Sequence, residues 1–286
     1  MKKLICVLLT FYIFVSLVGC GNSSRPTHNR PASPDILQDP EQYTKCFEFE
    51  WNEEAGGYYV YERDGNPYID VVIPSKHNGK PVVGIGKYAF SSYSKIRTVI
   101  VPESVTIVEN YAFSYCDYLK YVEFQSGSKL LTIKDYAFNN CKIIEKVYVP
   151  ASVEKIGYRA FSTCPLLEEV EIDSANKFYC NLNGNLYSKD LKTLVLVMPT
   201  TIEKEFTVFE GVARLEDGAF RDCDNVEIIN LPSTIEYLGA NLIGHYIEEI
   251  HYDGTIEEWE KIEKAEKWDE KAPNCVVICT NGTVEK

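Results

Sequence analysis

Ile156-Gly157-Tyr158-Arg159-Ala160-Phe161-Ser162-Thr163-Cys164 is the clearest copy of a short motif that the chain repeats six times. Five copies contain an Ala-Phe pair, with the phenylalanine at Phe90, Phe113, Phe138, Phe161 and Phe220, and a degenerate sixth has Leu242-Ile243 in its place. Successive phenylalanines are separated by 23, 25, 23 and 59 residues. Self-similarity at such a period is typical of a solenoid, in which each unit buries its apolar face only against its neighbours. The sequence therefore predicts a stack of similar turns.

Each copy places further apolar side chains at fixed offsets from its phenylalanine. The residues five before, three after, six after and nine after are apolar, aromatic or thiol in all five Ala-Phe copies, and those between them are mostly polar. In chain order they are Ile85, Tyr93, Ile96, Val99, Val108, Cys116, Leu119, Val122, Ile133, Cys141, Ile144, Val147, Ile156, Cys164, Leu167, Val170, Leu215, Cys223, Val226 and Ile229. Together with the phenylalanines, which we expect to form one continuous spine, these positions are the predicted core.

The spacing also predicts the secondary structure within one repeat. The segment that begins at the alanine and ends six residues after the phenylalanine has the spacing of a helix or a tight turn. The next segment, such as Val147-Tyr148-Val149-Pro150, alternates with period two and predicts a short strand that the proline ends. Strand and turn together span about 23 residues, the leucine-rich-repeat length class. The predicted fold is an α/β solenoid, with short parallel strands on one face and short helices or turns on the other.

The repeats resemble a known family. The pattern Ile/Val-Pro-x-Ser-Val-x-x-Ile-Gly-x-x-Ala-Phe-x-x-Cys-x-x-Leu, which Pro150–Leu167 follows almost residue for residue, is similar to the BspA-like leucine-rich repeats (type 5) of bacterial surface proteins. Asp70–Pro74 and His77–Val82 resemble the first repeat of that family, and Tyr252–Thr255 with Trp259 resembles its terminal cap. The resemblance covers roughly residues 58–282. It implies a solenoid capped at both ends and, more loosely, a surface adhesin or antigen.

One departure from the period lies between Phe161 and Phe220. Asn183-Gly184 and Lys189-Asp190, with the apolar run Thr193–Met198, predict that a β-hairpin replaces one repeat there. We expect this excursion, at about 173–208, to bend the stack.

The start of the chain predicts export. Lys2-Lys3 precede an apolar stretch that is too short and wrongly flanked for a stable membrane span, as in a secretory signal. Leu17-Val18-Gly19-Cys20 resembles a bacterial lipobox, which implies cleavage before Cys20 and lipid attachment to it. The alternative is an ordinary signal with a chance cysteine. The proline-rich residues that follow predict an extended tether.

These features divide the chain into five parts. The expected organisation is a signal peptide at 1–19, a lipidated flexible tether at 20–42, an N-terminal cap and first repeat at 43–84, the solenoid at 85–252, and a C-terminal capping helix and strand at 253–286. Thr255 and Glu258 predict a capping box at the start of that helix, with Ile256, Trp259 and Ile262 on one face. The helix closes the open stack in this interpretation, and a partner-binding helix is the alternative.

The charge of the chain is strongly acidic, at −13. Without Lys2 and Lys3 it becomes −15, from 27 basic and 42 acidic residues. Nucleic acids and anionic lipid surfaces both attract basic patches, so neither is an expected partner, and membrane contact is expected through the lipid anchor only. An acidic surface serves solubility, or it attracts basic segments of a partner.

Cysteines occupy one equivalent position in four repeats, at Cys116, Cys141, Cys164 and Cys223. We interpret them as a ladder of reduced, buried thiols, because free cysteine behaves as a small hydrophobe. Disulfides between neighbouring turns are the alternative, and zinc is disfavoured because thiols in a row cannot surround it tetrahedrally.

No residue pattern indicates catalysis. The four histidines lack metal-ligand spacing, and the chain contains no zincin, nucleophile-elbow or P-loop motif. Carboxylates are abundant but evenly spread. We therefore expect a protein that is not an enzyme, with no cofactor and no metal.

The candidate binding residues lie on the outer face of the predicted strands, where the side chains beside each inward valine point outward. Clustered tyrosine and apolar side chains on a rigid array suit protein recognition. The candidates are Ile100, Tyr121, Tyr148, Glu123, Lys146 and Glu171. An ordinary solvated face is the alternative.

The predicted function is a lipid-anchored, cell-surface leucine-rich-repeat protein of a bacterium that binds another protein as an adhesin does. The partner would be a host extracellular matrix protein or another surface protein. The alternative is a surface antigen or envelope scaffold without a specific ligand. A solute-binding lipoprotein is disfavoured, because a single array lacks the cleft between two lobes.

Overall fold

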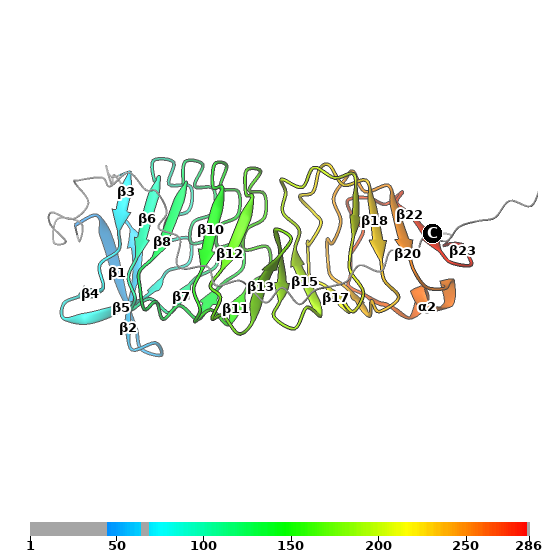
Figure 1. The fold of residues 1–286 in the computed structure, drawn as a ribbon. Helices are drawn as coiled ribbons and strands as arrows, with labels where there is room; N and C mark the ends of the chain where they lie inside the picture. Colours follow the sequence, from blue (N-terminus) through cyan, green and yellow to red (C-terminus); the bar gives the residue numbers. More distant parts are fainter. Residues whose placement is uncertain (1–44, 64–68, 285–286) are drawn as a thin grey trace, which may run out of the picture.

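The chain forms one elongated stack of turns (Figure 1). A computed structural model describes residues 45–63 and 69–284. The predicted signal peptide at 1–19, the lipid-bearing Cys20 and the tether at 20–42 lie outside the described residues. The stack has two sides made of parallel strands, with turns connecting them.

One side of the stack, which we call the long-strand face, consists of strands of three or four residues. They are β3 (Asp70–Val72), β6 (Thr98–Val101), β8 (Tyr121–Phe124), β10 (Lys146–Val149), β12 (Glu169–Ile172), β16 (Glu205–Thr207), β18 (Ile228–Leu231), β20 (Glu249–Tyr252) and β22 (Val276–Cys279). The other side, the short-strand face, contains β5 (Lys80–Ile85), β7 (Ile107–Val108), β9 (Thr132–Ile133), β11 (Lys155–Ile156), β15 (Thr193–Leu196), β17 (Arg214–Leu215), β19 (Tyr237–Leu238) and β21 (Glu263–Lys264).

The register of the parallel strands confirms the predicted repeat. Val99 pairs with Val122 and Val147 with Val170, so equivalent residues of successive repeats lie side by side. All four valines are buried, as period-two alternation predicts.

One prediction for the side that carries the Ala-Phe motif needs correction. Short helices or turns were predicted there, and the structure has turns and short strands. Tyr88 and Ser92 of one turn have φ of 60° and 63°, and Tyr111 and Tyr115 of the next have 60° and 59°. A left-handed residue every four positions prevents a helix from continuing. Alternate backbone N–H groups donate to the next turn instead, as from Phe90 to the Ala112 carbonyl at 2.7 Å. The α/β description therefore does not hold: the one helix in the described ranges, α2 (Ile256–Lys261), belongs to the C-terminal cap.

The predicted phenylalanine spine runs through the first half of the stack. Phe90, Phe113, Phe138 and Phe161 are all buried, and their rings stack at centroid distances of 5.1, 5.2 and 5.6 Å. Interplanar angles of 7° to 10° show that each ring lies almost parallel to the next. Adjacent turns therefore share one core, as predicted.

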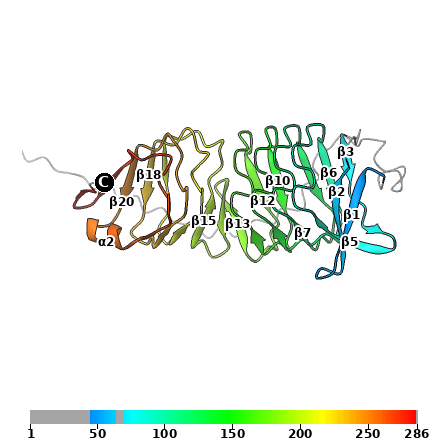
Figure 2. The same ribbon diagram turned by 180° about the vertical axis from the view of Figure 1, so that it is seen from behind.

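An antiparallel hairpin interrupts the spine. β13 (Tyr179–Leu182) and β14 (Asn185–Ser188) pair around Asn183-Gly184, and β14 pairs in turn with β15. Residues with φ of 51° and 83° make this turn, as the Asn-Gly pair predicts. Both views place these strands midway along the molecule (Figures 1 and 2).

The hairpin divides the apolar core in two. Leu186 packs in the N-terminal core, and Tyr187, the next residue, packs in the C-terminal core with Phe220. The expectation of one unbroken spine through Phe220 is therefore wrong. A degenerate repeat remains between Phe161 and Phe220. In it Val197 takes the place of the phenylalanine, because its N–H donates to the Ala219 carbonyl of the next turn, as the Phe90 N–H donates to the Ala112 carbonyl. Here β13–β15 are called the seam.

Caps cover both ends. At the start, β1 (Phe47–Asn52) and β2 (Gly57–Glu62) form a hairpin that continues the sheet of β5, and β4 (Lys76–His77) pairs with β5 at its edge. At the far end β23 (Gly282–Val284) folds back on β22. Thr255 and Glu258 form the predicted capping box of α2, and Trp259 is the buried residue of this helix.

The cysteines of the ladder are thiols outside any disulfide, and they donate hydrogen bonds to backbone carbonyls. Each of three thiols donates through Sγ to the carbonyl of the phenylalanine one turn earlier: Cys116 to Phe90, Cys141 to Phe113 and Cys164 to Phe138, at 3.0, 3.2 and 3.1 Å. No disulfide joins Cys116, Cys141, Cys164 or Cys223, which agrees with the interpretation as packing.

Burial makes a testable difference in thiol reactivity. Burial raises the pKa of Cys116 to about 12, and the thiolate is the nucleophile. We expect iodoacetamide at pH 8 to modify the partly buried Cys46 and to spare Cys116 until guanidinium is added, as measured by peptide mass mapping. Equal labelling of both in the native chain would contradict the buried ladder.

Candidate functional site

The candidate site lies on the long-strand face, where β8, β10 and β12 follow one another. In each strand the inward residue is a buried valine, so the residues on either side of it point outward. Lys146 lies beside Glu169 and Tyr148 beside Glu171 in the parallel register. The predicted columns of outward side chains are therefore present.

Five of the six predicted residues reach the surface. Tyr121, with 37% of its surface exposed, Glu123 and Lys146 are exposed, and Tyr148 and Glu171 are half-buried.

Ile100 does not belong to the site, which corrects the sequence prediction. Its exposed fraction is 8%, and all of β6 is buried. Val72 on β3 and Glu123 on β8 flank Ile100 in the register. The accessible face therefore begins at β8.

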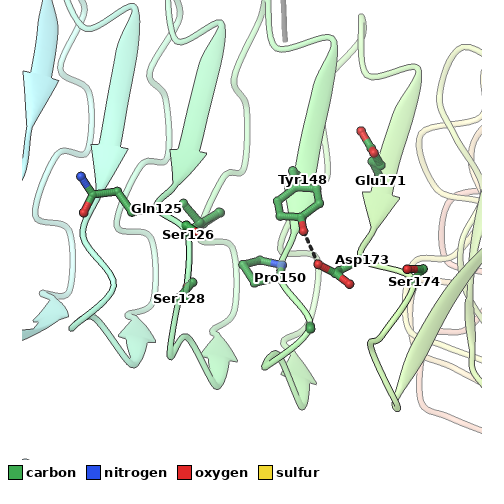
Figure 3. Close-up of a pocket in the computed structure, with 11 residues that line it drawn as sticks. Gln125, Ser126, Ser128, Tyr148, Pro150, Glu171, Asp173 and Ser174 are labelled. Atoms are coloured by element: carbon green, nitrogen blue, oxygen red, sulfur yellow. Dashed lines mark hydrogen bonds between the residues drawn. The ribbon is translucent and has the colours of Figure 1, made fainter. Parts of the chain in front are cut away.

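Tyr148 is at the centre of the site. Its hydroxyl donates a hydrogen bond to Asp173, the residue directly after β12 (Figure 3). A hollow of about 290 Å³ surrounds this contact. The hollow is lined by Phe124, Gln125, Ser126, Gly127, Ser128, Tyr148, Pro150, Ala151, Glu171, Asp173 and Ser174. Its walls are thus the loops that follow β8, β10 and β12.

A second, smaller hollow of about 90 Å³ adjoins Tyr148 on the strands themselves. Tyr121, Glu123 and Lys146 line it, together with Lys120 and Glu145. Because Tyr148 borders both hollows, they form one shallow surface across three strands. We call this surface the tyrosine face.

Ion pairs order the lysines of the tyrosine face. Lys146 Nζ lies 3.0 Å from Glu169 Oε2, and Lys120 Nζ lies 2.9 Å from Glu145 Oε1. The hydrogen bond from Lys146 to Glu169 raises the pKa of this lysine. Exposed pairs contribute little stability, so their effect is to hold the side chains in place.

The sequence matches the family described as the BspA type leucine rich repeat region, in six copies that cover residues 80–196 and 198–261. The chain belongs to this family. No significant match to a curated protein is found.

Solved structures of similar bacterial proteins share the fold of this BspA-type chain. The pneumococcal vaccine antigen PcpA aligns with a TM-score of 0.53 and 20% identity, over 68% of this chain and 66% of that one. The alignment thus spans just under two thirds of the antigen. A leucine-rich repeat protein from Eubacterium ventriosum aligns with a TM-score of 0.52 and 18% identity, over 74% of this chain and 71% of that one.

Sequence reasoning missed part of the tyrosine face of this BspA-type protein. Asp173, Ser126 and Ser174 follow the strands and do not alternate within them, so the outward-facing pattern did not include them. Their position within two residues of a strand end was the available signal, because the ends of parallel strands meet at one edge of a sheet.

Other kinds of site have no support in the described ranges. No cluster of three or more histidine, cysteine or acidic residues able to hold a metal ion occurs in residues 45–63 and 69–284. Within the same ranges, no helix has the length and apolar character to cross a membrane. The tyrosine face offers aromatic rings, hydroxyls and carboxylates on a rigid support, an arrangement suited to binding.

Proposed function

We propose that this BspA-type protein acts by binding and not by catalysis, and that its tyrosine face holds a partner protein. The observation that carries the proposal is the placement of Tyr121 and Tyr148 on neighbouring parallel strands beside two hollows. Tyrosine offers a large contact area at low cost in side-chain entropy. Strands are rigid, so little ordering is needed on binding.

The charge of the tyrosine face favours a basic partner segment. Glu123, Glu145, Glu169, Glu171 and Asp173 outnumber Lys120 and Lys146 on these strands and loops. Charge complementarity speeds encounter and selects partners. An extracellular matrix protein or another surface protein with exposed lysine or arginine fits this chemistry.

The proposal includes export and a lipid anchor at Cys20, on the resemblance of residues 17–20 to a lipobox. Several acyl chains on one residue hold a protein far more firmly than one chain. Labelled palmitate is expected to co-migrate with the chain and to be lost in Cys20→Ala. Unlabelled wild-type chain would remove the anchor from the proposal.

A surface antigen or scaffold without a specific ligand is the second candidate. One of the solved chains that it resembles is a vaccine antigen, which favours a surface location and leaves the ligand open.

Removal of both tyrosines tests the binding role. We expect Tyr121→Ala with Tyr148→Ala to weaken binding of the fragment from Gln42 onward to its partner by about 10- to 100-fold, since tyrosines are frequent hot spots. Surface plasmon resonance on immobilised matrix proteins measures this loss. Tyr246→Ala is the matched control, because Tyr246 is 57% exposed and lies far along the chain.

Unchanged affinity in the double variant would exclude the tyrosine face as the site. Absence of any binding by the wild-type fragment would favour the scaffold.

A further inference from the structure

A layer of the stack is missing on the Ala-Phe side, next to Arg159. In regular turns the residue two before the phenylalanine donates its backbone N–H to the next turn. The bonds run from Tyr88 to the Asn110 carbonyl, from Tyr111 to that of Asp135 and from Tyr136 to that of Tyr158, at 3.1, 3.1 and 3.0 Å. Arg159 holds this position in the following turn.

The pattern ends at Arg159. Neither its backbone N–H nor that of Phe161 finds an acceptor among the described residues, although the Tyr136 and Phe138 groups one turn earlier do. On the far side, the Asp217 carbonyl occupies the accepting position and receives no hydrogen bond from the described part of the chain.

A short turn in the seam causes this gap. Leu194 pairs with Leu215, and Val197 donates to the Ala219 carbonyl just before Phe220. The segment between Leu194 and Val197 is therefore two residues shorter than the one between Leu215 and Phe220. The turn is therefore recessed at this level. Arg159 and Phe161 line one side of the space and Asp217 the other, and the Arg159 side chain reaches across it to Gly218.

The space is a cavity of about 540 Å³, which we call the notch. Ile156, Val195 and Leu196 give it apolar walls, and Phe178, which is 44% exposed, stands at its rim. Arg159 Nε is buried there without a hydrogen-bond partner in the described structure. The Arg159 guanidinium lies over the rings of Tyr136 and Tyr158, at 5.4 and 5.8 Å from their centroids.

The notch carries more acidic than basic groups. Asp135, Glu154, Glu216 and Asp217 line it, against Lys155 and Arg159. Two of the acids are used internally, because Asp135 accepts from the Tyr158 N–H at 2.9 Å and Asp217 from the Ala240 N–H at 2.6 Å. Burial raises the pKa of Glu216, although Arg214 opposes the effect. A cation placed beside Glu216 would relieve the cost of burying its carboxylate.

We propose that the notch binds an extended, lysine- or arginine-containing peptide segment of a partner protein, which supplies the missing layer. Carbonyls two residues apart accept from the N–H groups of Arg159 and Phe161, and a peptide N–H donates to the Asp217 carbonyl. An apolar side chain fills the cavity and a basic one faces Glu216.

Three observations favour a peptide over another ligand. The vacant donors are two residues apart, which matches the spacing of carbonyls on one edge of an extended strand. Unused donors line one side of the notch and an unused acceptor lines the other, and a strand within a sheet needs both. The surplus of carboxylates disfavours an anion. This site is separate from the tyrosine face, so neither proposal depends on the other.

Amide exchange of the full chain in mild detergent tests the vacancy. In the free chain the Arg159 and Phe161 amides are expected to exchange at least about tenfold faster than those of Tyr136 and Phe138, because unbonded amides lack protection. A five-residue peptide of alternating lysine and leucine is expected to slow both. A peptide of alternating glutamate and leucine is the control and leaves them unchanged.

Equal protection of all four amides in the free chain, or no slowing by the lysine peptide at millimolar concentration, would overturn the proposal.

Two substitutions in the notch extend the test. Glu216→Gln is expected to weaken the lysine peptide about tenfold, as loss of a partly buried charge partner does. Leu196→Trp fills the cavity and abolishes binding. Glu123→Gln and Tyr121→Ala, both on the tyrosine face, leave peptide affinity unchanged. Loss of peptide binding in Tyr121→Ala would show that the peptide occupies the tyrosine face, and would refute the notch as the peptide-binding site. Circular dichroism confirms that each variant is folded.

Discussion

Replacement of Phe138 by alanine is expected to lower the free energy of unfolding by about 3–5 kcal/mol. Phe138 has no exposed surface and stacks between Phe113 at 5.2 Å and Phe161 at 5.6 Å. Its removal leaves a cavity against both neighbours. Because each turn is stabilised by the turns beside it, the lesion should also fray the middle of the N-terminal stack.

Urea denaturation measures this effect as a lower midpoint and, if the stack frays, a lower slope. Tyr118→Ala is the matched control, since Tyr118 is an aromatic residue of the preceding turn with 59% of its surface exposed. We expect that control to change stability by less than about 0.5 kcal/mol. An unchanged midpoint and slope for Phe138→Ala would refute the core.

The second large effect is expected at Asn176, just before the seam. Its buried side-chain amide donates to the carbonyls of Pro150 and Val153 at 3.0 and 2.9 Å, and its Oδ1 accepts from the N–H groups of Phe178 and Tyr179. In Asn176→Ala the Pro150 carbonyl keeps the bond that it accepts from the Val153 N–H. The Val153 carbonyl and the N–H groups of Phe178 and Tyr179 lose their partner, at a cost of about 3 kcal/mol. Since two of them begin the hairpin, the seam should loosen first.

Thermal unfolding measures the total loss, and faster amide exchange in β13 and β14 locates it. Asn225→Ala is the control, because Asn225 is exposed and donates a single hydrogen bond, to the Thr201 carbonyl. If Asn176→Ala melts at the same temperature as the wild type, the buried amide is not a structural clamp.

Much of the fold could be predicted from the sequence because the repeat places the same residue at the same level of every turn. The offsets from Phe113 and Phe138 give the inward valines and the thiol ladder directly. Asn183-Gly184 predicts the hairpin because its backbone can adopt the left-handed turn.

The turns could not be told from helices by spacing. Apolar residues at intervals of three satisfy a helix and also a turn closed by bonds between residues three apart, such as Tyr93 N–H to the Phe90 carbonyl. Only the left-handed φ of residues such as Tyr115 decides between them, and tyrosine gives no hint of it.

The tyrosine face and the notch depend on register between distant segments. Alternation placed Ile100 on the outer face but could not show that its side chain is buried there. Val197 lacks the Ala-Phe signature, so its turn was not recognised as a shortened repeat. The vacant donors beside Arg159 follow from that shortening.

The seam also governs how such a molecule can change length. Each turn meets only the turns before and after it, while the hairpin separates two cores. Duplication of a whole unit on either side would extend the reach by about 4.8 Å. The seam would keep its own contacts in such a duplication, so either half of the protein can gain a repeat without changes at the centre.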